Sequence, residues 1–193
     1  MMDPTFDSIL DLTLRFEVGP WYDPNDPDVI AGRILTPLQK KKCGYVNDPA
    51  DPGGETKFGI ASNANRGVDI KSLTLPMARG IYYNKYWLPT VASKCNSPLS
   101  AIVFDAAVNS GPTRAVVFLQ RALGIADDGV FGPASAKALA NSDQYAVASK
   151  YLDIREMFFR NIVTNNPSQA RFLAGWLDRI NKLRTWLAAQ PKS

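Results

Sequence analysis

The sequence predicts an α+β protein that is mainly helical, with a small mixed lobe at its N-terminal side and a helical bundle after it. Three observations predict this class: an amphipathic helix at the start, a proline-rich stretch with a short hairpin at 20–58, and helical periodicity from residue 74 onward. The chain of 193 residues is long enough for this arrangement, and its composition is that of a globular protein.

The first element is a helix with Glu17 at its end. Asp3 and Pro4 form a typical helix start, with Asp as the N-cap and Pro at the first helical position. Apolar residues follow at helical spacing, and Glu17 lies on the same stripe. Gly19 and Pro20 end the helix. The sequence therefore predicts a carboxylate at the C-terminal end of a buried stripe.

The second region, 20–58, is rich in Pro, Asp, Asn and Gly, and it predicts little regular helix. Short strands of a small hairpin are expected at Tyr45-Val46 and at 57–60. A long irregular stretch inside a compact domain is typically functional or flexible.

The third region is helical. Thr74 can cap a helix that runs towards Trp87, and Asn96-Ser97-Pro98 breaks it. Further amphipathic segments, joined by Gly, Pro or Asn, follow at 100–109, 113–124, 132–141, 143–163 and 168–189.

The composition excludes several kinds of chemistry. There is no histidine, which removes Ser-His-Asp and Cys-His catalysis and most zinc sites. Cys43 and Cys95 fit no metal-ligand spacing; we expect two reduced thiols, with a disulfide as the alternative. No metal and no organic cofactor is predicted.

The net charge of +4 arises from residues 100–193. A basic C-terminal half suits a polyanionic partner such as cell wall, or is merely a solvated helical surface. No nucleic-acid-binding motif accompanies it, so we expect no nucleic-acid partner. No apolar stretch predicts a membrane helix, and the start lacks the basic region of a signal peptide. We expect a monomer made in the cytoplasm that reaches a cell wall only when another agent releases it, or when a virion carries it.

Glu17 is the candidate proton donor for glycoside hydrolysis. This reaction needs a carboxyl group that stays protonated beside the leaving oxygen, and inverting enzymes need a second carboxylate to activate water. Of the three glutamates, Glu17 alone combines an apolar stripe with a rigid helix end, where a negative charge is disfavoured. The alternative is a glutamate that simply reaches solvent.

Asp51 and Thr56 are the candidate water-activating pair. They lie five residues apart across a Gly-Gly turn, so a hairpin there can bring a carboxylate and a hydroxyl together. Asp48 and Glu55 are weaker substitutes for Asp51. The alternative is an ordinary Asp- and Pro-rich surface turn.

The segment GYVNDPADPGGETKFGI closely resembles the signature of the family 108 glycoside hydrolases, the phage endolysins. LTLPMARGIYYNKYWLP resembles their next helix, and FDAAVNSGPTRAVVFLQRALGIADDGVFGPASAKAL is similar to their peptidoglycan-binding region. The resemblance implies a lysozyme-like fold and a Glu-Asp-Thr site, which by position is Glu17, Asp51 and Thr56. It also implies domains at 1–97, catalytic with an inserted loop at about 20–42, and at 98–193, helical and packed on the first.

The spacing departs from the family. Glu17 precedes Asp51 by 34 residues, whereas an unbroken alignment would place Lys42 at the family's glutamate. We favour an insertion over loss of the catalytic residue, because Glu17 ends a suitable helix and Lys42 follows no comparable one. A loop can grow at small entropic cost when its ends remain close.

We therefore predict a phage-type, bacteriolytic peptidoglycan hydrolase: a muramidase that cleaves between N-acetylmuramic acid and N-acetylglucosamine by inversion. Tyr45, Asp48, Phe58 and Asn109 are candidate substrate-binding residues. The alternatives are a non-catalytic peptidoglycan-binding or virion structural protein, and a lytic transglycosylase. The element 127–133, DDGVFGP, resembles one common in wall-binding modules, or is only a cap and hinge.

Overall fold

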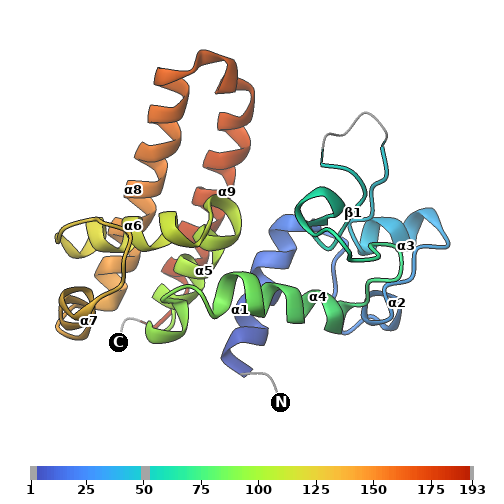
Figure 1. Cartoon of the computed structure of the whole chain (residues 1–193), viewed down its shortest axis with the longest axis horizontal. Coiled ribbons are helices and arrows are strands. Elements are labelled where there is room, and N and C mark those ends of the chain that lie inside the picture. Colours follow the sequence, from blue (N-terminus) through green and yellow to red (C-terminus); the bar gives the residue numbers. More distant parts are fainter. Residues whose placement is uncertain (1–3, 49–52, 192–193) are drawn as a thin grey trace. The chain divides into compact units, whose positions relative to one another are not determined.

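The computed structural model describes residues 4–48 and 53–191 (Figure 1). The chain forms two compact units, an N-terminal unit (1–85) and a C-terminal unit (86–193). The mainly helical α+β class is confirmed, because the described residues hold one two-stranded sheet among many helices. The expected domains 1–97 and 98–193 stay a prediction, since compactness alone does not define independently folding parts.

The N-terminal unit combines one long helix with short elements and connecting loops. Its elements are α1 (Pro4–Glu17), α2 (Pro27–Ile30), α3 (Pro37–Lys42), β1 (Thr56–Lys57), β2 (Ile60–Ala61), η1 (Ser62–Ala64) and α4 (Leu75–Tyr82). A π-helical turn, η2 (Tyr83–Trp87), leads into the C-terminal unit.

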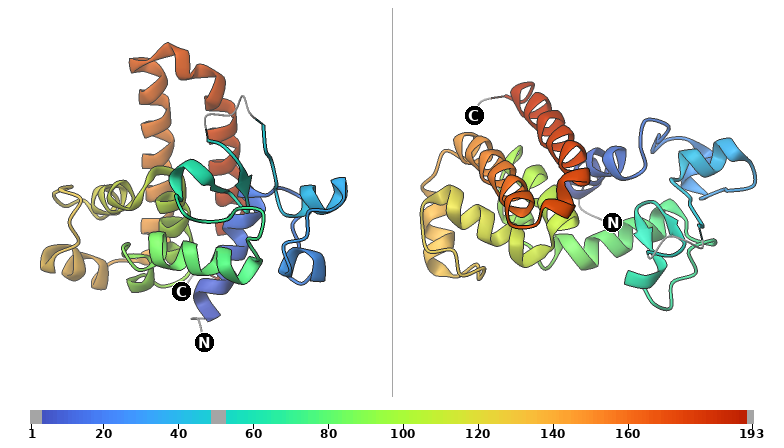
Figure 2. Two further views of the ribbon diagram at one scale, coloured as in Figure 1. Left: turned by 45° about the vertical axis from the view of Figure 1, so that its right-hand side comes forward. Right: turned by 90° about the horizontal axis from the view of Figure 1, so that it is seen from above.

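The C-terminal unit is almost entirely helical (Figure 2). Its elements are η3 (Ala92–Lys94), α5 (Leu99–Ser110), α6 (Pro112–Leu123), α7 (Pro133–Ala140), α8 (Gln144–Asn165), η4 (Pro167–Gln169) and α9 (Ala170–Ala188). None of the described helices combines the length and the apolar character needed to cross a membrane.

Helix α1 has Pro4 at its first position and ends at Glu17, as the sequence predicts; Asp3 lies outside the described residues. Its apolar stripe is buried, and the buried side chains are Phe6, Ile9, Leu10, Thr13 and Leu14. After the helix, Gly19 has a φ of 100°, a conformation that favours glycine. The chain therefore turns away just beyond Glu17.

Arg79 of α4 fastens that helix to α1. Its guanidinium lies 2.7 Å from a carboxylate oxygen of Asp7 and 2.7 Å from one of Asp11. The Tyr22 hydroxyl also donates to Asp11, at 2.7 Å. Because Arg79 is largely buried, these charge-assisted hydrogen bonds are stronger than typical surface ion pairs.

The segment 20–42 contains two short helices, which corrects one expectation. Lys42 does end a helix, α3, whose start is formed by a capping box between Thr36 and Gln39. This helix has six residues and buries none of them, whereas α1 has fourteen residues and a buried stripe. The local signal was Thr36-Pro37, an N-cap followed by Pro at the first helical position.

In the C-terminal unit, α5 is the central helix. Every residue from Leu99 to Ala107 is buried, so the helix is covered on all sides. Helices α6 and α8 pack against it, and α8 and α9 form a helical hairpin whose two arms lie side by side (Figures 1 and 2).

A buried carboxylate joins three of these helices. Asp105 of α5 accepts hydrogen bonds from Arg155 of α8, at 2.9 Å, and from Arg179 of α9, at 2.7 Å. Asp105 and Arg155 are both fully buried. Burial alone would raise the pKa of Asp105, but the charges of Arg179 and Arg155 and their hydrogen bonds hold that pKa below its ordinary value.

Candidate active site

The β-hairpin that follows the Asp- and Gly-rich motif has a two-residue turn. Thr56 pairs with Ala61 and Lys57 with Ile60, so Phe58 and Gly59 form the turn. Their φ angles are 52° and 72°, as in the type I′ turn that suits the twist of a hairpin. The expected strand at 57–60 is therefore wrong in register, because the chain reverses at Phe58-Gly59.

Phe58 is held in this conformation from three directions. Its ring is fully buried. Its N–H donates to the carbonyl oxygen of Cys43, at 2.8 Å, and its own carbonyl oxygen accepts from the Tyr82 hydroxyl, at 2.9 Å. A positive φ is costly for a residue with a side chain, so these contacts are what stabilise the turn.

Glu17 lies against this turn. A Cβ atom added to Gly59 would lie 3.0 Å from the Cβ of Glu17 and 2.7 Å from the Tyr82 hydroxyl oxygen. One turn residue therefore contacts both the end of α1 and α4, and only glycine fits there without displacing one of them. Glu17 itself is half-buried.

A second contact joins the end of α1 to the same part of the chain. A Cβ atom added to Gly44 would lie 3.2 Å from the Cα atom of Val18. The backbone therefore leaves at Val18 and returns beside it at Gly44. The segment 20–42 forms an excursion whose two ends lie close together.

The motif residues 47–55 are flanked by Val46 and Thr56, which a pair of backbone hydrogen bonds joins. The N–H of Val46 donates to the carbonyl of Thr56 at 2.9 Å, and the N–H of Thr56 donates back at 2.8 Å. Val46 was expected in a strand, and this bridge is its only described pairing with the hairpin. Asp51 lies outside the described residues.

The other predicted site residues differ in exposure. Thr56 is half-buried, and its hydroxyl donates to the carbonyl of Gly54 at 3.3 Å. Tyr45 donates to Glu55 at 2.5 Å, and this hydrogen bond raises the pKa of Tyr45. Asp48 is exposed.

Phe58 and Asn109 lie in different settings. The Phe58 ring has no exposed surface with which to contact a sugar, so its contribution to the site is through the shape of the turn. Asn109 is exposed near the end of α5 in the C-terminal unit, where it accepts a hydrogen bond from the Ser110 hydroxyl at 3.3 Å.

Lys57 is a structural residue that the sequence reasoning missed. It is fully buried, and its ammonium donates to the carbonyl of Lys71 at 2.7 Å. Burial lowers the pKa of Lys57. A Cβ atom on Gly32 would lie 3.0 Å from this ammonium nitrogen, so Lys57 joins the hairpin to both flanking loops. Alternation along a two-residue strand is too short a signal to predict it.

Neither thiols nor metal ligands form a reactive cluster in the described residues. Cys43 and Cys95 are free, and burial raises the pKa of Cys43 to about 11 and that of Cys95 to about 12. Both thiols are therefore protonated at neutral pH and poor nucleophiles. Across 4–48 and 53–191, no group of three or more Cys, Asp and Glu side chains could hold a metal ion.

Two family models match the chain. The model described as glycosyl hydrolase 108 matches residues 36–111. The matched residues, 36–111, are called the glycosyl hydrolase 108 segment below. A second model, described as a "Predicted Peptidoglycan domain", matches residues 114–181. The resemblance inferred from the motif is therefore confirmed, and the two matches support a glycoside hydrolase that acts on peptidoglycan.

The structure of Brucella abortus SagA is similar to this chain, with a TM-score of 0.69 at 25% sequence identity. The similarity covers 96% of this chain and 94% of that one. The fold is consistent with a lysozyme-like α+β arrangement. No curated protein sequence matches the chain. The glycosyl hydrolase 108 match begins after Glu17, so the glutamate enters the candidate site through the contacts of α1 and not through the matched segment.

Proposed function

We propose that the protein is an N-acetylmuramidase that hydrolyses the bond between N-acetylmuramic acid and N-acetylglucosamine, with Glu17 as proton donor. The observation that carries the proposal is the contact between Glu17 and Gly59. It brings the base of the Glu17 side chain, at a rigid helix end, against the hairpin of the glycosyl hydrolase 108 segment. A general acid must be held rigidly at the leaving oxygen, and this arrangement supports that role.

In the proposed mechanism, Glu17 protonates the glycosidic oxygen while Asp51, with Thr56, orients and activates a water molecule on the opposite face of the sugar. The anomeric centre is inverted. Inverting enzymes have their two carboxyl groups about 6.5–9.5 Å apart. The support for Asp51 is its place in the motif sequence, between Val46 and Thr56, which a backbone bridge joins.

For substrate binding we propose Tyr45 and Asp48, at either side of the motif's start, and Asn109 in the C-terminal unit. Tyr45 is half-buried and already hydrogen-bonded to Glu55, which fixes its ring. We assign Phe58 a positioning role through the turn, because its ring is buried.

The decisive experiment compares Glu17→Gln with Asp69→Asn. Asp69 is an exposed carboxylate in the same unit, and it accepts hydrogen bonds from Ser72 within its own loop. Release of reducing ends from purified peptidoglycan should fall about 100- to 10,000-fold in Glu17→Gln and stay at the wild-type level in Asp69→Asn. Full activity in Glu17→Gln, with the fold intact, would contradict the assignment of Glu17 as the proton donor.

Asp51→Asn tests the second carboxylate, with Asp48→Asn and Glu55→Gln as competing assignments. The proposal expects the largest loss in Asp51→Asn. A loss confined to Glu55→Gln would move the water-activating role to Glu55.

Product analysis decides between hydrolysis and transglycosylation. Mass spectrometry of the digested muropeptides should show reducing N-acetylmuramic acid ends and not anhydromuramic ends, and NMR of the fresh product should show the inverted anomer. Anhydromuramic ends would make the protein a lytic transglycosylase that needs Glu17 alone. Binding to peptidoglycan without any cleavage would make it a wall-binding or virion structural protein.

The proposed setting is phage-mediated degradation of the bacterial wall, in which another agent gives the protein access. Purified protein should therefore lyse cells whose envelope has been permeabilised and leave intact Gram-negative cells turbid. Equal lysis of both would contradict the need for a separate agent.

A further inference from the structure

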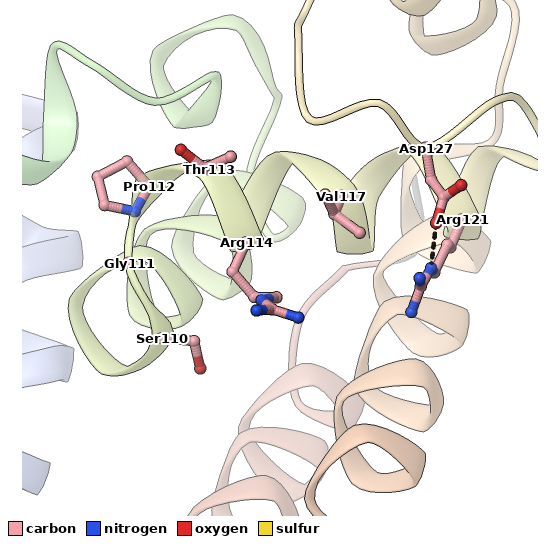
Figure 3. A pocket seen from close by; sticks show the side chains of 8 residues that line it. All are labelled: Ser110, Gly111, Pro112, Thr113, Arg114, Val117, Arg121 and Asp127. Carbon is pink, nitrogen blue, oxygen red and sulfur yellow. Dashed lines mark hydrogen bonds and ion pairs between the residues drawn. The ribbon is translucent and has the colours of Figure 1, made fainter. Parts of the chain in front are cut away.

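The C-terminal unit has a pocket of about 470 Å³ along one face of α6 (Figure 3). Arg114, Val117 and Arg121 are spaced by three and four residues, so they lie in a row on that face. The turn from Ser110 to Pro112 lines one end, and Asp127 lines the other. The pocket therefore has two guanidinium groups and one carboxylate in a lining that mixes polar and apolar residues.

The two arginines are in different states. Arg121 is paired with Asp127, at 2.6 Å. Arg114 is exposed, its guanidinium lies 4.9 Å from the centre of the Phe158 ring, and it forms no ion pair with any described residue. Stacking on an aromatic ring holds a guanidinium plane in place while its N–H groups remain free to donate. Within 4–48 and 53–191, Arg114 is thus an oriented cation without an anionic partner.

A second pocket, of about 450 Å³, shares Pro112 and Thr113 with the first. It is more apolar, and its lining includes the exposed side chains of Leu88 and Val130 together with the ring of Phe131. The two pockets therefore adjoin each other at the start of α6. A ligand that crosses Thr113 would meet an apolar surface on one side and guanidinium groups on the other.

The loop 127–131 borders both pockets, and Gln120 holds it rigidly. The buried Gln120 amide donates to Asp128 at 2.7 Å and to the carbonyl of Val130 at 3.0 Å, and it accepts from the N–H of Gly129 at 2.8 Å. A Cβ atom on Gly129 would lie 3.0 Å from the Thr113 methyl group, so glycine lets the loop lie directly on α6. This loop is therefore held in place before any ligand binds, which reduces the entropic cost of binding.

We propose that the Arg114 pocket binds a carboxylate of the peptide stem of peptidoglycan. This inference rests on the proposed function for its substrate. The glycan carries little negative charge, because the lactyl carboxylate of muramic acid is consumed in the amide bond to the stem, whereas the stem itself carries free carboxylates. Arginine binds carboxylates through two parallel N–H groups, and the pocket offers no aromatic ring among its lining residues on which a sugar could stack.

The test uses the full chain and the soluble tripeptide L-Ala-γ-D-Glu-L-Lys as probe, with affinity measured by calorimetry. Arg114→Gln should weaken binding about tenfold, the loss of one charge-assisted pair. The matched control is Arg171→Gln. Arg171 is also exposed and also stacks on a phenylalanine, 4.7 Å from the Phe172 ring centre, but outside the pocket. This variant should bind as the wild type does.

Two further probes test the chemistry. The same tripeptide with its carboxyl groups converted to carboxamides should bind at least about tenfold more weakly than the free acid. Inorganic phosphate at the concentration of the peptide should not displace it. Equal binding of acid and amide, equal losses in both arginine variants, or displacement by phosphate would each overturn the stem assignment.

Reducing-end release from intact peptidoglycan and from glycan strands stripped of their stems separates this inference from the proposed function. Cleavage of glycan without any binding of the tripeptide would support the muramidase proposal and contradict the proposed stem-binding site. Arg114-dependent binding of the tripeptide without any cleavage would support the stem-binding site and contradict the proposed muramidase activity.

Discussion

The two units are stabilised in different ways. In the N-terminal unit, the contacts around the candidate donor depend on glycines: Gly44 lies against Val18, and Gly59 lies against Glu17. In the C-terminal unit, long helices surround the buried carboxylate of Asp105. The candidate site in the N-terminal unit therefore depends on glycines, whose lack of a side chain lets distant segments approach closely. The helical C-terminal unit depends instead on buried charged side chains that pair with one another.

The largest expected effect tests the scaffold. Asp105→Asn leaves Arg155 buried without its counter-charge, and the free energy of unfolding of the C-terminal unit should fall by about 3–5 kcal/mol. Asp153→Asn is the matched control, since Asp153 is 62% exposed where it pairs with Arg184, and it should cost at most about 1 kcal/mol. Urea denaturation measures both. Equal losses would mean that the buried cluster contributes no more than a surface pair.

The same carboxylate makes stability depend on pH. Burial acts to raise the pKa of Asp105, but Arg179 and Arg155 hold it below its ordinary value. Its contribution is therefore fully present above the unfolded-state pKa of about 3.9 and is lost as pH falls through the lower folded-state value. The melting temperature of the wild type should fall more steeply below pH 4 than that of Asp105→Asn. Parallel curves would contradict this.

The next effect tests the glycine contacts of the N-terminal unit. Gly59→Ala adds a Cβ atom to a backbone with positive φ and presses it on Tyr82 and Glu17. We expect about 2–3 kcal/mol of destabilisation, and about a 10²-fold loss of activity from displacement of the donor.

Gly67→Ala is the control for Gly59→Ala. Gly67 also has a positive φ, of 87°, but a Cβ atom there meets nothing within 4 Å. It should cost about 1–2 kcal/mol from the backbone alone and leave activity unchanged. If Gly59→Ala and Gly67→Ala lose the same fraction of activity, the contact between Gly59 and Glu17 is not important for catalysis.

A smaller effect tests the support of the turn. Tyr82→Phe removes the hydroxyl that donates to the carbonyl of Phe58 and should cost about 1 kcal/mol. Tyr83→Phe is the control. The ring of Tyr83 contacts Phe6, and this substitution removes a hydroxyl without breaking a described hydrogen bond. Thermal unfolding distinguishes the two, and identical melting curves would assign the turn to packing alone.

The smallest effect has the opposite sign. The hydroxyl of Thr13 is buried in α1 and has no hydrogen-bond partner among the described residues. Thr13→Val should therefore stabilise the N-terminal unit by up to about 1 kcal/mol. A loss of stability would show that the hydroxyl is satisfied in solution, for example by a water molecule.

Local signals in the sequence predicted the ends of most helices correctly. Pro4 and Thr74 begin helices as expected, because caps and helix-starting prolines act over a single turn. The register of the hairpin was wrong because the I′ turn uses Phe58, a residue that rarely adopts positive φ and does so here under tertiary contacts.

Contacts between distant residues were not predictable from one sequence. Asp105 and Arg155 are separated by 50 positions, and Glu17 and Gly59 by a segment with no periodicity. The motif resemblance suggested that Glu17 joins the hairpin, but only the folded chain gives the contact with Gly59. The burial of Lys57 had no local signal at all.

The close approach of Val18 and Gly44 has an evolutionary consequence. Because the two ends of the segment 20–42 lie in contact, the length of this segment does not determine the position of Glu17. The entropic cost of closing the loop also rises only slowly as residues are added. We therefore expect that segments of other lengths can replace residues 20–42, in evolution or by engineering, without a change in the positions of the reacting groups.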